Sequence, residues 1–344
     1  MHMKRWFTLT AIASVISVAG VLVTSPVVQA QQDATQAEVA KPEFADYVEA
    51  LKDEARAQGF TDATLEQAFA GVKYYKKAVE ADKNQPEFKL TLDTYLPRAV
   101  PAWKSKKALE MYNEHKPLLE EVGEKFGVQP RFIVALWGIE TNFGSFTGGF
   151  DVISALTTLA YDGRREAFFK KELWHALTII QDGHIAVNQM KGSWAGAMGQ
   201  TQFMPSSFMN YAVDYDGDGR KDIWNSFPDV FASAANYLSS VGWRDDVTWG
   251  RQVQLPSGFD ISLATLDTKK SLAQWQALGV RTYEGEELPN RDDIVASVVI
   301  PDDEQGRVYL AYANYDALMR WNRSHYFVAA VGLLSDKIRF NRAE

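Results

Sequence analysis

The residue best suited to proton chemistry is Glu140, in the stretch ALWGIETNFGSFTGGF at 135–150. This carboxyl group lies between an apolar run and a loop rich in glycine and aromatic residues. A helix that begins at Pro130 places Glu140 on the same face as Ile133 and Trp137, at the i, i+4 and i+7 spacing of a core-facing stripe. We therefore expect the Glu140 side chain on the buried side of this helix.

Two features of this position disfavour a charged Glu140. Gly144 follows one turn later and predicts that Glu140 lies near the helix C-terminus, the negative end of the helix dipole. Burial also disfavours the carboxylate, so the pKa should be raised, as a general acid requires near neutral pH. The alternative is a structural glutamate that is paired with an arginine or capped by backbone amides.

A second segment, KGSWAGAMGQTQFMPSSF at 191–208, combines glycines with neutral polar residues. Glycines allow a substrate to approach the backbone closely. Side chains such as Ser193, Gln200 and Gln202 can bind hydroxyl groups and N-acetyl amides. The Gly-Lys-Ser/Thr ending of a phosphate-binding loop is absent. The alternative is a tight loop that serves only helix packing.

Aromatic and amide side chains recur further along the chain. AANYLSSVGW contains Tyr237, and RWNRSHYF contains Trp321, Asn322 and Tyr326. Sugar rings have apolar faces and hydroxylated rims, so this combination suits a carbohydrate site. Each aromatic residue on its own is equally compatible with the hydrophobic core.

The segment DYDGDGRKDIWN at 214–225 matches the calcium-loop pattern D-x-[DN]-x-[DN]-G. Its twelfth position holds Asn225 instead of the usual bidentate glutamate, which predicts weaker binding or a longer loop. A set of ligands that offers only oxygen favours calcium over zinc. The alternative is an Asp/Gly-rich turn without metal. The predicted calcium ligands are Asp214, Asp216, Asp218, the carbonyl of Arg220, Asp222 and, from the next helix, Asp229.

These residues need a scaffold, and the hydrophobic pattern predicts a mainly helical one. Helical spacing begins at Phe44 and is frequent from 104 to 237, whereas 247–300 contains strand-like runs and helix is expected again from 308. We expect a mainly α (α+β) fold with a small β insert. The predicted regions are a signal peptide at 1–30, N-terminal helices at 31–103, a catalytic core at 104–246, a strand-rich insert at 247–300 and C-terminal helices at 301–344.

Composition and the N-terminus restrict the location and partners. Lys4 and Arg5 precede an apolar stretch that ends in VVQA at 27–30, which predicts signal-peptide cleavage after Ala30. A retained membrane anchor is the alternative, but the run is short and contains Ser and Thr. The net charge of −8 argues against a nucleic-acid partner. The absence of cysteine excludes thiol nucleophiles, disulfides and cysteine-based zinc sites, and suits an exported bacterial protein in the periplasm.

Five segments, in order, resemble motifs of the lytic murein transglycosylase B family of periplasmic peptidoglycan enzymes. They are GIETNFG, GSWAGAMGQTQFMPSSF, YDGDGRKDIWNS, AANYLSSVGW and WNRSHYF, between about 130 and 327. The resemblance implies a lysozyme-like helical core with an additional helical region and a small β region. It also implies cleavage of the MurNAc–GlcNAc β-1,4 bond with a 1,6-anhydromuramoyl product, and no organic cofactor.

The resemblance also assigns roles to individual residues. Glu140 matches the single catalytic acid of the family, and Arg164 and Arg165 match its contacts with the peptide stem. The family's calcium loop is longer than twelve residues, which favours Asp229 as a ligand. Implied partners are peptidoglycan strands and other cell-wall enzymes. The implied glycan-binding residues are Ser193, Gln202, Phe203, Tyr237, Asn322, Tyr326 and, as a weaker match, Tyr95.

Two departures from the family pattern are informative. The lipid-attachment cysteine of some members is absent, which favours a soluble form without a stable membrane span after signal cleavage. Trp321 stands where some members have tyrosine.

A single acid suffices for cleavage if the acetamido group of MurNAc attacks C1 while Glu140 protonates the leaving oxygen. Ordinary glycosidases use two carboxylates, and the sequence reveals no second one at a predictable spacing from Glu140. Two alternatives stay open. One is a hydrolytic muramidase with a second carboxylate elsewhere in the chain, and the other is a non-catalytic peptidoglycan-binding or calcium-sensing protein.

Overall fold

Local sequence signals set the ends of the helices. In the computed structural model, α2 (Asp62–Phe69) begins after Thr61, whose side chain accepts a hydrogen bond from the amide of Thr64. Helix α6 (Lys116–Phe126) ends at Gly127, which takes the left-handed conformation that glycine adopts readily. Helix α7 (Pro130–Thr141) has proline in its first turn, as the sequence predicts.

The structure describes residues 41–83, 91–302 and 306–341, and residues from Pro42 onward form one compact unit. The predicted signal peptide lies outside the described residues. Among those described, no helix combines the length and apolar character needed to cross a bilayer.

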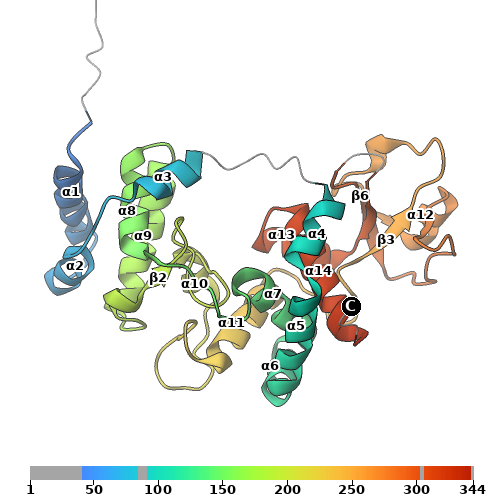
Figure 1. Ribbon diagram of the computed structural model, residues 1–344, viewed down its shortest axis with the longest axis horizontal. Coiled ribbons are helices and arrows are strands. Elements are labelled where there is room, and N and C mark those ends of the chain that lie inside the picture. Colours follow the sequence, from blue (N-terminus) through green and yellow to red (C-terminus); the bar gives the residue numbers. More distant parts are fainter. Residues whose placement is uncertain (1–40, 84–90, 303–305, 342–344) are drawn as a thin grey trace, which may run out of the picture. The chain divides into compact units, whose positions relative to one another are not determined.

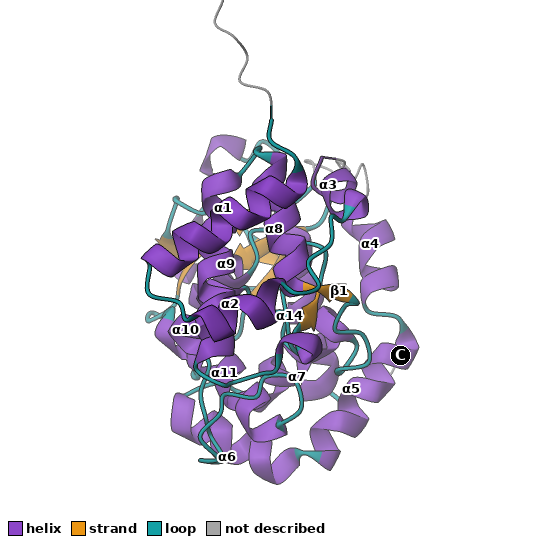
Figure 2. Cartoon of the chain, turned by 90° about the vertical axis from the view of Figure 1, so that its left-hand side faces the viewer, coloured by secondary structure: helices purple, strands orange, loops and turns teal. Residues whose placement is uncertain are grey.

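Figure 2 shows how strongly helices dominate, which confirms the mainly α prediction. The remaining helices are α1 (Phe44–Ala57), α3 (Lys76–Lys83), α4 (Leu92–Ala99), α5 (Ala102–Glu114), α8 (Val152–Asp162), α9 (Glu166–Gln181), α10 (Pro205–Tyr211), α11 (Phe227–Ser240), α12 (Leu272–Ala277), α13 (Ala313–Trp321) and α14 (His325–Arg339), with 3-10 turns at Val187–Gln189 and Ile261–Leu263.

The strands form two small antiparallel sheets. One pairs β1 (Phe150–Asp151) with β2 (Lys191–Gly192). The other has the strand order β4-β6-β7-β3-β5, and its strand β3 lies with α12 in the orange segment of Figure 1. Its strands are β3 (Gly250–Gln254), β4 (Lys270–Ser271), β5 (Arg281–Thr282), β6 (Val295–Val299) and β7 (Val308–Ala311).

One local expectation was wrong. The segment Val308–Ala311 was expected to begin a helix, but it is β7, the middle strand of the larger sheet. All four of its residues are buried, so it lacks the alternation that marks a half-exposed strand. Residues 80–102 have a less regular sequence pattern, and they contain α4, which tolerates Pro97 because this residue lies close to the helix end.

Buried side chains form three hydrophobic clusters. The first joins α4–α7, α11, α13 and α14, and the second joins α1–α3 with α8–α10 and the glycine-rich segment. The third fills the small sheet and α12. Trp321 packs against both the first and the second cluster. The site described below lies along this junction.

Candidate active site

Helix α7 presents Glu140 as its penultimate residue, near the negative end of the helix dipole. Ile133, Leu136 and Trp137, on the same face, are buried in the first cluster. Glu140 itself is partly buried, and it is hydrogen-bonded to Trp321, which packs against both of the first two clusters. The predicted placement of the carboxyl group is therefore confirmed.

The chain leaves α7 through three consecutive left-handed residues. Asn142, Phe143 and Gly144 have φ angles of 50°, 60° and 75°. Only the last is a glycine, so the first two carry a backbone strain that is uncommon for non-glycine residues. A Cβ atom at Gly144 would lie 2.2 Å from the Gln200 Oε1 atom, so the turn depends on glycine here.

Gln200 connects α7 with the glycine-rich segment and the acidic loop. Its Oε1 atom accepts a 2.8 Å hydrogen bond from the buried Trp137 indole, and its backbone carbonyl accepts one from the Thr141 hydroxyl at 2.7 Å. Its amide nitrogen donates to the Trp224 carbonyl at 2.8 Å. Gln200 was noted in the sequence only as a polar residue, and its structural role depends on contacts between residues far apart in the chain.

The environment of Glu140 favours the protonated carboxyl group. Burial raises the pKa of Glu140 to about 7, and a hydrogen bond from the Trp321 indole to Oε1, at 2.8 Å, opposes part of this rise. The direction of the expected pKa shift is therefore confirmed. No carboxylate within the described parts of the chain contributes to this shift.

Trp321 is held in place by two aromatic residues that the sequence assigned to glycan binding. Its ring centroid lies 5.4 Å from that of Phe203 and 4.6 Å from that of Tyr237. The Tyr237 hydroxyl donates to the carbonyl of Arg320, at 2.8 Å, which fixes the end of α13. The sequence marked Trp321 only as a departure from the family pattern, and its bond to Glu140 spans 181 positions.

Tyr95 and Tyr326 lie beside one another near the same carboxyl group. Their ring centroids are 5.3 Å apart, and the negative charge of Glu140 contributes, after burial, to a raised pKa of Tyr95. The Tyr326 hydroxyl donates to the Asp302 carboxylate, which also accepts the amide of Leu92 at 2.9 Å. Sequence reasoning missed Asp302, because no local motif marks it.

The glycine-rich segment contributes Ser193 and Gln202 in fixed geometries. The Ser193 hydroxyl accepts backbone amides from Ala195 and Ala197, at 3.3 and 3.1 Å. Gln202 has a left-handed backbone, with φ of 51°, and its amide donates to the Thr147 carbonyl at 3.0 Å. Asn322, a further predicted glycan contact, is exposed directly after α13.

Arg164 and Arg165 are brought together by a residue that the sequence did not reveal. Both guanidinium groups contact the carboxylate of Asp82, which is almost completely buried, and Arg164 also donates to the Asp82 carbonyl at 2.6 Å. The two side chains remain partly exposed. Their predicted contact with peptide stems stays a prediction.

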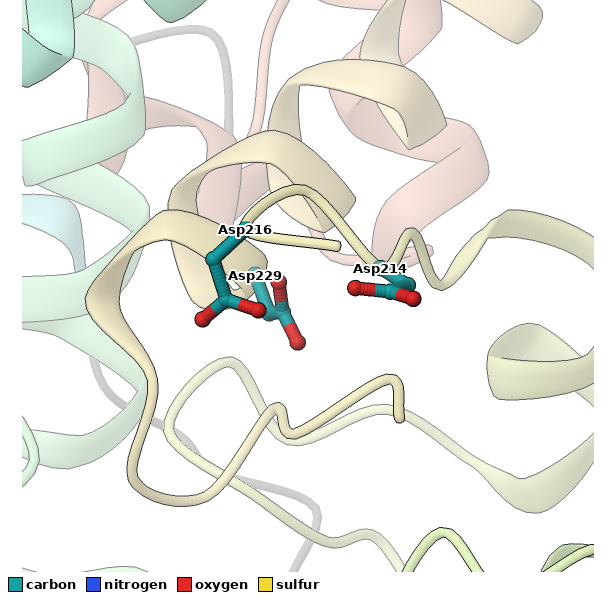
Figure 3. Close-up of side chains that lie close together, drawn as sticks. All are labelled: Asp214, Asp216 and Asp229. Carbon is teal, nitrogen blue, oxygen red and sulfur yellow. The ribbon is translucent and has the colours of Figure 1, made fainter. Parts of the chain in front are cut away.

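Three of the predicted calcium ligands converge in the acidic loop. Oxygen atoms of Asp214, Asp216 and Asp229 lie within 4.8 Å of one another, and Figure 3 shows the three carboxylates around a common space. Asp229 comes from the first turn of α11 and is fully buried. Burial raises its pKa, while hydrogen bonds from the amides of Tyr215 and Asp222, each 2.7 Å, oppose the rise.

The other predicted ligands make contacts inside the loop. The Asp218 carboxylate accepts the backbone amide of Arg220 at 2.8 Å, and Asp222 accepts the amides of Trp224 and Asn225 at 3.0 and 2.9 Å. Neither carboxylate belongs to the group of three described above. Calcium ligation by Asp218, Arg220 and Asp222 therefore stays a prediction.

Comparisons with known proteins agree with this geometry. Residues 43–336 match the family model described as Transglycosylase SLT domain. Membrane-bound lytic murein transglycosylase B of Escherichia coli is 33% identical over 240 residues, which cover 68% of this chain and 63% of that relative, slightly less than two thirds of its length.

Two solved structures extend the comparison. SltB3 of Pseudomonas aeruginosa, in complexes with NAG-NAM-pentapeptide and with NAG-anhNAM-pentapeptide, superposes with a TM-score of 0.83 at 42% identity, over 86% of this chain and 79% of that one. Lytic transglycosylase Slt35 of E. coli, in complex with calcium, has a TM-score of 0.73 at 27% identity, over 89% and 95% of the two chains. The match along residues 43–336 and these similarities show that the chain belongs to the transglycosylase SLT domain family, as its resemblance to lytic murein transglycosylase B predicted.

Proposed function

We propose that this protein is a lytic transglycosylase that cleaves the MurNAc–GlcNAc β-1,4 bond of peptidoglycan and releases 1,6-anhydromuramoyl products. The observation that carries the proposal is Glu140, a partly buried carboxyl group with a pKa near 7 at the junction of two aromatic-lined clusters. Family membership and the muropeptide complexes of SltB3 support the choice of substrate.

In the proposed reaction, Glu140 acts first as an acid and then as a base. Its carboxyl proton moves to the glycosidic oxygen as the C1–O bond breaks, while the carbonyl oxygen of the MurNAc acetamido group bonds to C1. The Glu140 carboxylate then takes the proton from the C6 hydroxyl. The C6 oxygen bonds to C1, the bond from the acetamido oxygen breaks, and the anhydro ring closes.

The remaining predicted residues have supporting roles in this proposal. The Trp321 indole orients Glu140. Ser193, Gln202, Phe203, Tyr237, Asn322, Tyr326 and Tyr95 bind the glycan, and Arg164 and Arg165 bind the peptide stem. The protein acts in the periplasm after signal cleavage, on peptidoglycan strands and alongside other cell-wall enzymes.

Calcium is proposed as a structural ion. Asp214, Asp216 and Asp229 fit it, because they offer only carboxylate oxygens and because Asp229 is a fully buried acid in contact range of two other acids. When bound, the cation supplies positive charge that offsets the repulsion among the three carboxylates. The calcium complex of Slt35 supports this assignment.

The test of the proposed function is mass spectrometry of products released from purified murein in ¹⁸O-labelled water. We expect anhydromuropeptides that contain no solvent oxygen. Products with a reducing end that carries ¹⁸O would identify a hydrolytic muramidase instead. Binding of murein without any product would identify a non-catalytic binding protein.

A further inference from the structure

We propose that a shallow hollow between the start of α3 and β1 is an additional binding site for a pyranose unit of a long glycan strand. This inference rests on the proposed function and extends it to the length of strand that the protein recognises. The hollow encloses about 410 Å³ and is lined by Tyr74, Tyr75, Lys76, Lys77, Gly149 and Phe150. None of these residues was assigned to a site from the sequence.

The hollow is connected to the proposed glycan positions by an unbroken series of contacts. Gln202 holds the carbonyl of Thr147 at 3.0 Å, and the next residue, Gly148, is packed so tightly that a Cβ atom would lie 2.1 Å from the Gly192 carbonyl oxygen. In the β1–β2 pair, Phe150 lies opposite Gly192, which directly precedes Ser193. A glycan strand that contacts Ser193 and Gln202 can therefore continue along β1 into the hollow.

The chemistry of the lining suits a sugar ring. Tyr74 is 44% exposed, which leaves much of its aromatic surface open to a ligand. The rings of Tyr75 and Phe150 meet edge to face, with centroids 5.2 Å apart. Aromatic rings offer an apolar surface to the apolar face of a pyranose, while hydroxyl and ammonium groups can bind its rim.

The hollow is also rigidly supported, which reduces the entropy lost on binding. The Tyr75 hydroxyl donates to the Asp151 carboxylate at 2.6 Å, and Lys191 contacts the same carboxylate. The Tyr74 ring is held by Tyr161, with centroids 5.9 Å apart. Lys77 is exposed, and an ammonium group at this position can bind hydroxyl or lactyl carboxylate groups of a glycan.

The test compares kcat/KM on long peptide-free glycan strands and on a tetrasaccharide. For Tyr74→Ala we expect a loss of about three- to tenfold on long strands and less than twofold on the tetrasaccharide, because only long strands reach the hollow. Tyr74→Phe keeps the ring and should behave as the parent does on both substrates. Tyr283→Ala, which removes another exposed tyrosine directly after β5, is the matched control and should change neither value.

Three results would overturn the inference. They are unchanged turnover of long strands by Tyr74→Ala, equal losses on both substrates, and a loss by Tyr283→Ala as large as that by Tyr74→Ala. Equal losses would mean that Tyr74 acts through the fold, and melting curves of all variants would show this directly. A parent protein that cleaves neither substrate would overturn the proposed function itself. Differences among the variants test only the additional binding site, so the two failures can be told apart.

Discussion

Burial raises the pKa values of both Glu140, which is partly buried, and Asp229, which is fully buried, but their hydrogen bonds differ. Asp229 accepts two backbone amides, one on each oxygen, and lies next to two other carboxylates. Glu140 accepts one indole hydrogen bond on one oxygen and has no neighbouring carboxylate within the described residues. Burial alone therefore does not make an acid catalytic. The partners of Asp229 suit a bound cation, whereas those of Glu140 leave one oxygen available for a substrate.

The substitution Glu140→Gln should have the largest effect, and it tests whether Glu140 is the catalytic acid. It preserves the shape of the side chain and removes the proton, so turnover should fall by more than the ~10²–10⁴-fold typical of acid–base catalysis, because one group performs both proton transfers. Release of soluble muropeptides measures the loss, and murein pull-down should show that binding persists. Near-parental turnover would remove Glu140 from the mechanism.

The same substitution should change stability in a pH-dependent way. The folded pKa of about 7 lies above the ordinary value of a glutamate side chain, about 4.5, so the folded state keeps a proton that the unfolded chain releases. Stability of the parent is therefore lost as pH rises from about 4.5 through 7. Glu140→Gln should match the parent at pH 5 and exceed it by up to about 3 kcal/mol at pH 8. Chemical denaturation at both pH values measures this, and a less stable variant at pH 8 would indicate an ionised, well-paired Glu140.

Calcium binding to the acidic loop should raise the Tm, and this rise should not depend on Glu140. At a calcium concentration of about 100 times Kd, a bound ion stabilises the fold by about 2.7 kcal/mol, which for a chain of this length raises the Tm by roughly 4 °C. Asp214→Ala with Asp216→Ala should abolish this rise, whereas Glu140→Gln should retain it. A matched control, Asp246→Ala with Asp293→Ala, removes two acids outside the cluster and should also retain it. If millimolar calcium does not change the Tm of the parent protein, the acidic loop is a turn that binds no calcium.

A smaller effect is expected from Trp321→Phe, which keeps an aromatic ring and removes the indole donor. The hydrogen bond favours the ionised Glu140, so its loss should raise the pKa of Glu140 further. The alkaline limb of kcat/KM should move upward by at most about one pH unit. An unchanged limb would mean that Trp321 serves only as packing between Phe203 and Tyr237.

Sequence patterns predicted those features of the site that depend on residues close together in the chain. The helical spacing around Glu140 placed its side chain correctly. The loop pattern contains Asp214 and Asp216, which lie together with Asp229, a residue four positions beyond the twelve-residue pattern. Each of these predictions depends on residues within about sixteen positions of one another, where helix and turn geometry relate sequence to space.

The contacts that complete the site cross long stretches of chain. Trp321 and Glu140, Tyr326 and Asp302, and Arg164 and Asp82 meet only through tertiary packing, which leaves no periodic signal. The strand Val308–Ala311 was missed for a related reason, since its burial on all sides follows from its central place in the sheet.

The central claim, that the pKa of Glu140 is raised to near neutrality, is tested most directly by NMR titration of its carboxyl carbon. The measurement uses protein with ¹³C-labelled glutamate, and Glu140→Gln identifies the signal by its absence. We predict a titration midpoint near pH 7. A midpoint at the ordinary value for glutamate, about 4.3, would contradict the account, because the group would then be a carboxylate at the pH where it must donate a proton.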